Sequence, residues 1–200
     1  MGNFPPEKYY EACITHHLVN EFKERYDRLL YPFSISQIEE NSKGFDFGYT
    51  FSSKSFYIQY KRPFSFEVLD SKCSWQIDKT QLSVINSQSY ALQTYYALPA
   101  FINTNLWFSG IDNTYFIESN RLAFSLKQNQ NKKETKTNIV HSSLKSLRIW
   151  SDFSSRFSST LQNTIVQEQQ EFNFQEIINY AKNLDQNTRN QTWVYLLEVR

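Results

Sequence analysis

The segment Gly44–Pro63, GFDFGYTFSSKSFYIQYKRP, constrains the fold of this chain more than any other. Apolar residues occupy every second position on both sides of a central SSKS, a pattern typical of a β-hairpin with one buried face. The pattern predicts strands over residues 45–51 and 56–61 and a turn at 52–55. Pro63 ends the second strand, because proline cannot donate a hydrogen bond to a neighbouring strand.

The register of this hairpin decides which polar side chains meet. A turn centred on residues 52–55 places apolar residues opposite one another throughout the hairpin. On the polar face, the same register places Asp46 opposite Lys61 and Gly48 opposite Gln59. Because Gly48 has no side chain, we expect open space beside Gln59 and Asp46.

A carboxylate, an amide oxygen and an ammonium group therefore converge on one face. Carboxylate and carbonyl oxygens are the ligands that Mg²⁺ or Mn²⁺ prefers. Such a cation polarises a phosphodiester and activates water, while a lysine orients that water and offsets negative charge. Asp46, Gln59 and Lys61 are thus candidate residues of a phosphodiester-hydrolysing site.

Two glutamates could complete such a site. A helix predicted over about residues 7–30 carries an apolar stripe with a four-residue spacing. Glu11 lies seven residues before Leu18 of that stripe, nearly two helical turns, so we expect Glu11 to point inward. Glu40 lies six residues before Asp46, at the start of the first strand. The stripe consists of Tyr10, Ile14, Leu18, Phe22 and Tyr26.

The remaining segments indicate an α/β (α+β) fold with a mixed central β-sheet flanked by helices. The length suits one domain over residues 1–200, with a core over about 7–120 and a helical part over about 144–200. Further helices are predicted over residues 79–88, 144–161 and 172–184. Further strands are predicted over 90–101, ending at Pro99, over 114–119 and over 192–199. Residues 127–138 are a predicted mobile loop, and residues 33–44 are a predicted short connection with a strand-like or single-turn piece.

Composition sets limits on partners and location. The net charge is +1, from 21 basic and 20 acidic residues, so a nucleic acid would be held by a local patch. Cys13 and Cys73 are far apart and lack metal-ligand spacing, which favours buried reduced thiols. The first residues lack an apolar leader and no long apolar run follows, so we expect a cytoplasmic protein without a membrane segment.

One pattern resembles the PD-(D/E)XK nuclease superfamily, which has the restriction-endonuclease-like fold. That family has an Asp on one strand and (Asp/Glu)-x-Lys on the next, after a helix that often carries a Glu. The spacing to Gly44 favours Glu40 over Glu39 as the extra acid. The matching residues are Glu40-x-x-x-Gly44-x-Asp46, a hairpin, and then Gln59-Tyr60-Lys61.

The resemblance implies a role for each matched residue. Asp46 corresponds to the metal-binding aspartate, Gln59 to the second acid and Lys61 to the catalytic lysine. Glu11 corresponds to the helix glutamate, and Glu40 to a frequent additional acid. The chain departs from the family at Gln59, where an amide replaces an acid, although Gln-x-Lys variants occur. It also lacks the proline before Asp46.

The implied activity is that of a Mg²⁺-dependent endonuclease, with DNA favoured over RNA. The stretch YYALPAF resembles bacterial nuclease-like proteins associated with phage defence, and the family implies self-association or assembly into a defence complex. A second hypothesis is an inactive nuclease-like subunit for nucleic-acid binding or assembly, prompted by Gln59 and the near-neutral charge. A third interpretation is an ordinary solvated hairpin with a weak Asp46–Lys61 pair.

Two histidines and several basic residues are the remaining candidate groups. His16 and His17 are adjacent on the first helix and do not share a face, which disfavours a joint metal site. Arg62 is a candidate phosphate contact, although strand alternation turns it away from Lys61. The basic residues of the predicted loop fit either a solvated loop or a contact with nucleic-acid backbone. These are Lys132, Lys133 and Lys136.

Overall fold

A computed structural model of the chain describes residues 4–51, 54–67, 72–127, 135–140, 147–154 and 193–194. Its helices are α1 (Glu7–Tyr26), α2 (Gln37–Lys43), α3 (Lys79–Ser87) and α4 (Ser119–Lys127), with 3₁₀ turns η1 (Ala91–Gln93) and η2 (Thr104–Ser109). Its strands are β1 (Tyr31–Ser34), β2 (Phe47–Phe51), β3 (Lys54–Tyr60), β4 (Pro63–Glu67), β5 (Lys72–Asp78), β6 (Thr94–Pro99), β7 (Thr114–Glu118), β8 (Lys136–Val140), β9 (Arg148–Ile149) and β10 (Trp193–Val194).

The strands form two sheets. The larger sheet has the order β10-β1-β2-β3-β6-β7-β9, and the smaller has the order β4-β5-β8. In the larger sheet β3 and β6 are parallel and the other neighbours are antiparallel. The predicted mixed sheet with flanking helices is therefore confirmed. Among the described residues, no helix combines the length and apolar character that a bilayer crossing requires.

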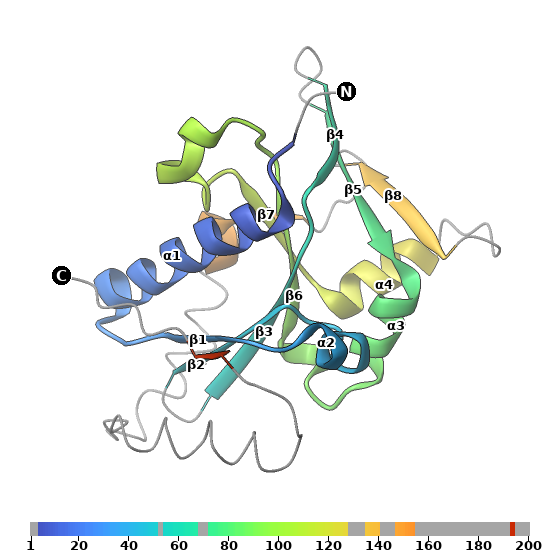
Figure 1. Cartoon of the computed structure of the whole chain (residues 1–200), viewed down its shortest axis with the longest axis horizontal. Coiled ribbons are helices and arrows are strands. Elements are labelled where there is room, and N and C mark those ends of the chain that lie inside the picture. The colour runs from blue at the N-terminus through green and yellow to red at the C-terminus, as the bar shows by residue number, and fades with distance from the viewer. Residues whose placement is uncertain are drawn as a thin grey trace.

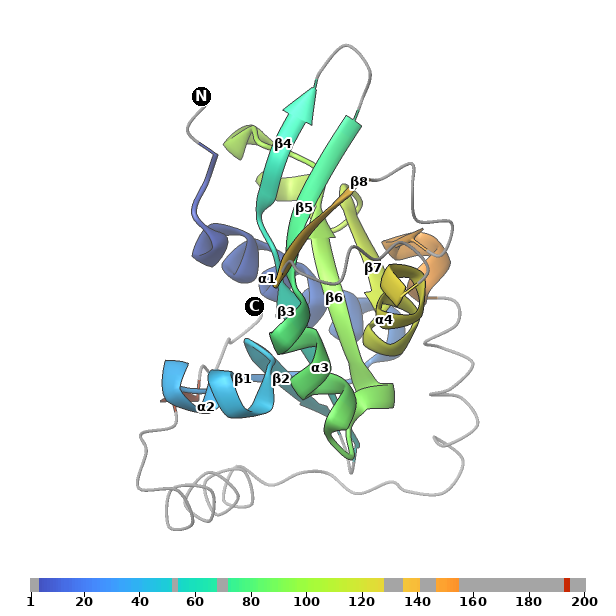
Figure 2. The same ribbon diagram turned by 90° about the vertical axis from the view of Figure 1, so that its right-hand side faces the viewer.

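Two apolar cores hold the layers together. Helix α1 packs on the face of the larger sheet formed by side chains of β2, β3 and β7, while α3 and α4 pack with β5, β6 and β8 in the second core (Figures 1 and 2). The predicted stripe lies in the first core, where Tyr10, Ile14, Leu18 and Phe22 are fully buried. Helix α1 ends at residue 26 rather than about 30, because Asp27 caps it in the left-handed conformation (φ 47°).

The hairpin has the predicted faces but a different register. Phe47 pairs with Ile58 and Tyr49 with Phe56, so each partner lies two residues earlier than expected. A two-residue shift leaves every side chain on the same face, and apolar alternation therefore cannot distinguish the two registers. The observed register places the Tyr49 and Phe56 rings 4.9 Å apart in a stacked pair.

The open space expected beside Gly48 does not exist. Gly48 pairs with Phe33 of β1, and a Cβ at Gly48 would collide with the Phe33 ring. Residues 33–44, predicted to be a short connection with a strand-like or single-turn piece, contain the second half of β1 and the whole of α2. The glycine therefore serves close packing between β1 and β2 rather than a binding gap.

Other segments divide between confirmed and wrong predictions. Helix α3 and strand β7 match their predicted ranges closely. The strand predicted over residues 90–101 is confirmed only at β6, Thr94–Pro99, because Ala91–Gln93 form the 3₁₀ turn η1. The loop prediction for 127–138 is wrong over Lys136–Asn138, which pair with Asp78–Gln76 of β5. The helix prediction for 144–161 is wrong at β9, although residues 150–154 are helical. The predicted helix 172–184, and the predicted strand 192–199 apart from β10, lie outside the described residues.

Candidate active site

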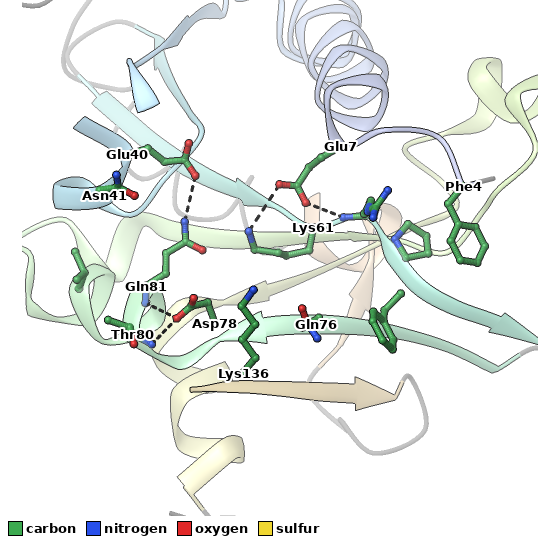
Figure 3. A pocket seen from close by; sticks show the side chains of 14 residues that line it. Phe4, Glu7, Glu40, Asn41, Lys61, Gln76, Asp78, Thr80, Gln81 and Lys136 are labelled. Carbon is green, nitrogen blue, oxygen red and sulfur yellow. Dashed lines mark hydrogen bonds and ion pairs between the residues drawn. The ribbon is translucent and has the colours of Figure 1, made fainter. Parts of the chain in front are cut away.

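Four elements meet around an open cleft of about 900 Å³. Its walls come from the start of α1, from α2 and α3, and from the β4–β5–β8 sheet, as Figure 3 shows. The polar and charged residues that line it are Glu7, Glu40, Asn41, Lys61, Arg62, Gln76, Asp78, Thr80, Gln81 and Lys136.

Three carboxylates gather where α1 crosses the end of the hairpin. One oxygen each of Glu7, Glu11 and Asp46 lies within 4.8 Å of the others. Glu7 and Glu11 are one helical turn apart on α1, and Asp46 occupies the bend immediately before β2. Sequence reasoning identified Glu11 and Asp46 but missed Glu7. The four-residue spacing of Glu7 and Glu11 is the feature that could have found it.

Asp46 is buried and accepts two hydrogen bonds from β3. Its Oδ2 accepts hydrogen bonds from Gln59 Nε2 (2.7 Å) and from the Tyr60 backbone N–H (2.6 Å). Burial raises the pKa of Asp46 well above its ordinary value, and the positive charge of Lys61 opposes that rise. The site therefore disfavours a bare negative charge on Asp46.

Glu11 points inward as predicted and is 3% exposed. Burial raises the pKa of Glu11, while a 2.7 Å ion pair from Lys8 Nζ opposes the rise. Glu11 and Asp46 are both buried, and their carboxylates lie close to that of Glu7. Added positive charge would therefore stabilise the ionised forms of these three carboxylates.

Lys61 approaches this group from the end of β3. Its Nζ lies 3.8 Å from Glu7 Oε1, and its backbone N–H bonds to Ala97 of β6. The predicted cross-strand pairing with Asp46 is wrong, because the observed register brings Gln59 beside Asp46 instead. Regular alternation also ends with β3, so Lys61 and Arg62 both line the cleft.

Gln59 is fully buried, and its hydrogen bonds engage both ends of its amide. Its nitrogen donates to Asp46, and its oxygen accepts from Gln81 Nε2 at 3.0 Å. Gln81 Nε2 also lies 3.3 Å from Glu40 Oε1. Glu40 therefore reaches the site through Gln81, and the Gln59 oxygen faces Gln81 rather than the carboxylates.

The two neighbouring glutamates of α2 have different surroundings. Glu39 forms a capping box with Ser36 at the start of α2 and an ion pair with Lys43 at 3.2 Å. The Glu39 carboxylate is therefore engaged in stabilising the helix. Glu40 faces the cleft. The structure thus places Glu40, and not Glu39, near the candidate site.

The other candidate groups lie apart from the carboxylates. His17 Nε2 lies 2.5 Å from the Trp107 carbonyl oxygen, and His16 contacts Asn20. Of the basic residues predicted to lie in a loop, Lys136 lines the cleft, while Lys132 and Lys133 fall outside the described residues. The two cysteines, Cys13 and Cys73, are buried free thiols as predicted.

Comparisons of this chain with protein-family models, curated proteins and solved structures found no match.

Proposed function

We propose that this protein is a metal-dependent nuclease that hydrolyses phosphodiester bonds in DNA, within the cytoplasm. The observation that carries the proposal is the meeting of Glu7, Glu11 and Asp46 within 4.8 Å, with Lys61 Nζ 3.8 Å from Glu7. The resemblance of the hairpin motif to the PD-(D/E)XK superfamily supports the same activity and a setting in antiviral defence.

The three carboxylates fit a hard divalent cation. Each offers an oxygen ligand, and burial raises the pKa of Asp46 and Glu11, so a nearby positive charge would favour their ionised forms. Bound Mg²⁺ or Mn²⁺ would supply Lewis acidity toward the phosphodiester. Asp46, Glu11 and Glu7 would hold it, whereas Glu40 and Gln59 stand outside this cluster of acids.

Three residues outside the carboxylate cluster would support hydrolysis. Lys61 would position the attacking water and offset negative charge that develops on the phosphate. Gln59 would fix the Asp46 carboxylate through its 2.7 Å hydrogen bond. Glu40 would orient Gln81, and through it Gln59.

A second candidate function is an inactive nuclease-like subunit that binds nucleic acid. The hydrogen bonding of Gln59 favours it: the amide nitrogen faces Asp46, and the oxygen is engaged by Gln81, so no second acid stands at this position. Such a subunit would keep the cleft and its basic side chains but would not hydrolyse the nucleic acid.

Plasmid incubation with Mg²⁺, with Mn²⁺ and with EDTA distinguishes these functions. We expect metal-dependent cutting that falls at least about a hundredfold in Asp46→Ala and in Lys61→Ala. Glu24→Gln, an exposed position farther along α1, is the matched control and should cut normally. Cutting that persists in both Asp46→Ala and Lys61→Ala contradicts the nuclease proposal. Absence of both cutting and Mn²⁺ binding by calorimetry supports the inactive subunit.

A further inference from the structure

An aromatic side chain stands at an irregularity on the β4–β5 wall of the cleft. In this antiparallel pair Pro63 opposes Trp75 and Ser65 opposes Ser74, so Phe64 has no partner residue on β5. Such a β-bulge turns the extra side chain away from its regular direction. Phe64 lines the cleft and is 52% exposed, so an apolar ring faces solvent at its edge.

Two basic residues border this wall. Arg62 and Lys136 line the cleft, and neither forms an ion pair with any residue in the described part of the chain. Lys136 stands opposite Asp78 in the β5–β8 pair, but the Asp78 carboxylate accepts hydrogen bonds from the first turn of α3. Figure 3 shows the Lys136 side chain extending into the cleft toward Lys61.

Charge is therefore distributed unevenly across the cleft. Glu7 and Glu40 come from the α1 and α2 side, whereas Lys136 and Phe64 come from the smaller sheet, where the Asp78 carboxylate is engaged by α3. Arg62 directly precedes β4, and its backbone N–H donates to Glu7 Oε2 over 3.1 Å. Phe4 lines the end of the cleft remote from Glu40 (Figure 3). The smaller-sheet side thus combines an aromatic ring with positive charge, a combination that binds bases and phosphates of a single strand.

We propose that the β4–β5–β8 wall binds unstacked single-stranded nucleic acid, with Phe64 stacking on a base and Arg62 and Lys136 contacting the adjacent phosphates. This assignment rests on the proposed function, because it supplies the substrate of that site. A ring can stack on a base only when the base has left the duplex stack. The cleft volume of about 900 Å³ also matches pockets that enclose small ligands, and so suits a short piece of one strand.

Fluorescence anisotropy of the full chain in EDTA tests the assignment without cleavage. The probes are labelled oligothymidylate, oligouridylate of equal length, and a duplex of the same length. We expect at least one single strand to bind about tenfold more tightly than the duplex. Phe64→Ala should weaken single-strand binding between about fivefold and a hundredfold, and Phe64→Tyr should restore it. Phe124→Ala on α4 is the control, because Phe124 is 65% exposed and does not line the cleft.

Salt titration separates the roles of ring and charge. Lys136→Ala should reduce the slope of log affinity against log salt by about 0.7, whereas Phe64→Ala should leave the slope unchanged. Photocrosslinking of the unaltered protein to an iodouracil-containing strand should label the peptide that contains Phe64. Duplex binding as tight as single-strand binding, unchanged affinity in Phe64→Ala, or crosslinking confined to another peptide would overturn the assignment.

The same samples keep this inference distinct from the nuclease proposal. Single-strand binding that depends on Phe64, without cutting when Mg²⁺ is added, supports the binding wall and contradicts hydrolysis. Metal-dependent cutting of a duplex, with Phe64→Ala fully active and binding normally, supports hydrolysis and overturns the binding wall.

Discussion

Gln59 donates a hydrogen bond from Nε2 to Oδ2 of Asp46 over 2.7 Å, inside a fully buried part of the hairpin. A carboxylate at residue 59 would meet Asp46 as a like charge, and one of the two acids would take up a proton. The amide instead satisfies one oxygen of Asp46 without adding charge. With glutamine at residue 59, the cluster of Glu7, Glu11 and Asp46 gains a hydrogen-bond donor and no fourth carboxylate.

The first prediction concerns the replacement Gln59→Glu. In EDTA, the additional acid should lower the free energy of unfolding by about 1–3 kcal/mol, because a buried donor is replaced by a like charge. Mg²⁺ should recover this loss, since the cation compensates the acids. Thermal denaturation with EDTA and with Mg²⁺ measures both effects. Gln76→Glu places the same change on the β5 wall of the cleft and should show a smaller loss in EDTA. Equal losses in the two variants would contradict the role assigned to Gln59.

The second prediction uses the raised pKa of Asp46. Because the folded protein holds this proton more tightly than the unfolded chain, the favourable contribution is present at low pH and is lost as pH rises from about 4 toward the raised pKa. In EDTA, Asp46→Asn should therefore be more stable than the unaltered protein near pH 8, and the difference should shrink near pH 4. The amide oxygen can still accept both native hydrogen bonds.

Urea denaturation across this pH range checks the sign of the difference. Asp112→Asn, an exposed position, is the matched control and should leave the pH profile unchanged. A loss of stability in Asp46→Asn near pH 8 would mean that the Asp46 carboxylate is stabilising in its ionised form, contrary to the burial seen here. Added Mg²⁺ should reverse the order of the two proteins, because the cation binds the unaltered site more tightly.

The third prediction concerns Glu7, which the sequence pattern did not single out. Glu7→Gln removes one of the three gathered charges and the ion-pair partner of Lys61. We expect the Kd for Mn²⁺ to rise about tenfold, equivalent to about 1.4 kcal/mol. Calorimetric titration measures it, with Glu24→Gln as an exposed control on the same helix. A Kd that does not change would place any cation away from Glu7.

Sequence patterns predicted the faces of this fold better than its pairings. The four-residue stripe of α1 and the alternation of the hairpin each reflect burial of one face, which a single sequence records directly. The register was not recoverable in this way, because both registers bury the same residues. Asp46 was therefore assigned Lys61 as its neighbour, whereas Gln59 occupies that place.

The smaller sheet shows a different reason for failure. The apolar residues of strand β5 alternate, with Cys73, Trp75 and Ile77 buried, and this alternation is typical of a strand. Strand β8 is an edge strand in which Ile139 is the one buried residue, and it carries little apolar pattern. The placement of Lys136 opposite Asp78 depends on a long-range pairing that no local pattern reveals.

The last prediction tests the close contact between β1 and β2. Gly48→Ala introduces a methyl group against the Phe33 ring, and overpacking of this kind costs about 1–3 kcal/mol of unfolding free energy. In a Phe33→Ala background the ring is absent, so the same Gly48→Ala change should be neutral or stabilising, because alanine restricts the unfolded chain more than glycine does. Urea denaturation of the four proteins gives the coupling between the two sites, expected to be at least about 1 kcal/mol. Equal effects of Gly48→Ala in both backgrounds would show that Phe33 does not fill the space beside Gly48, and the open space would again be available to the site.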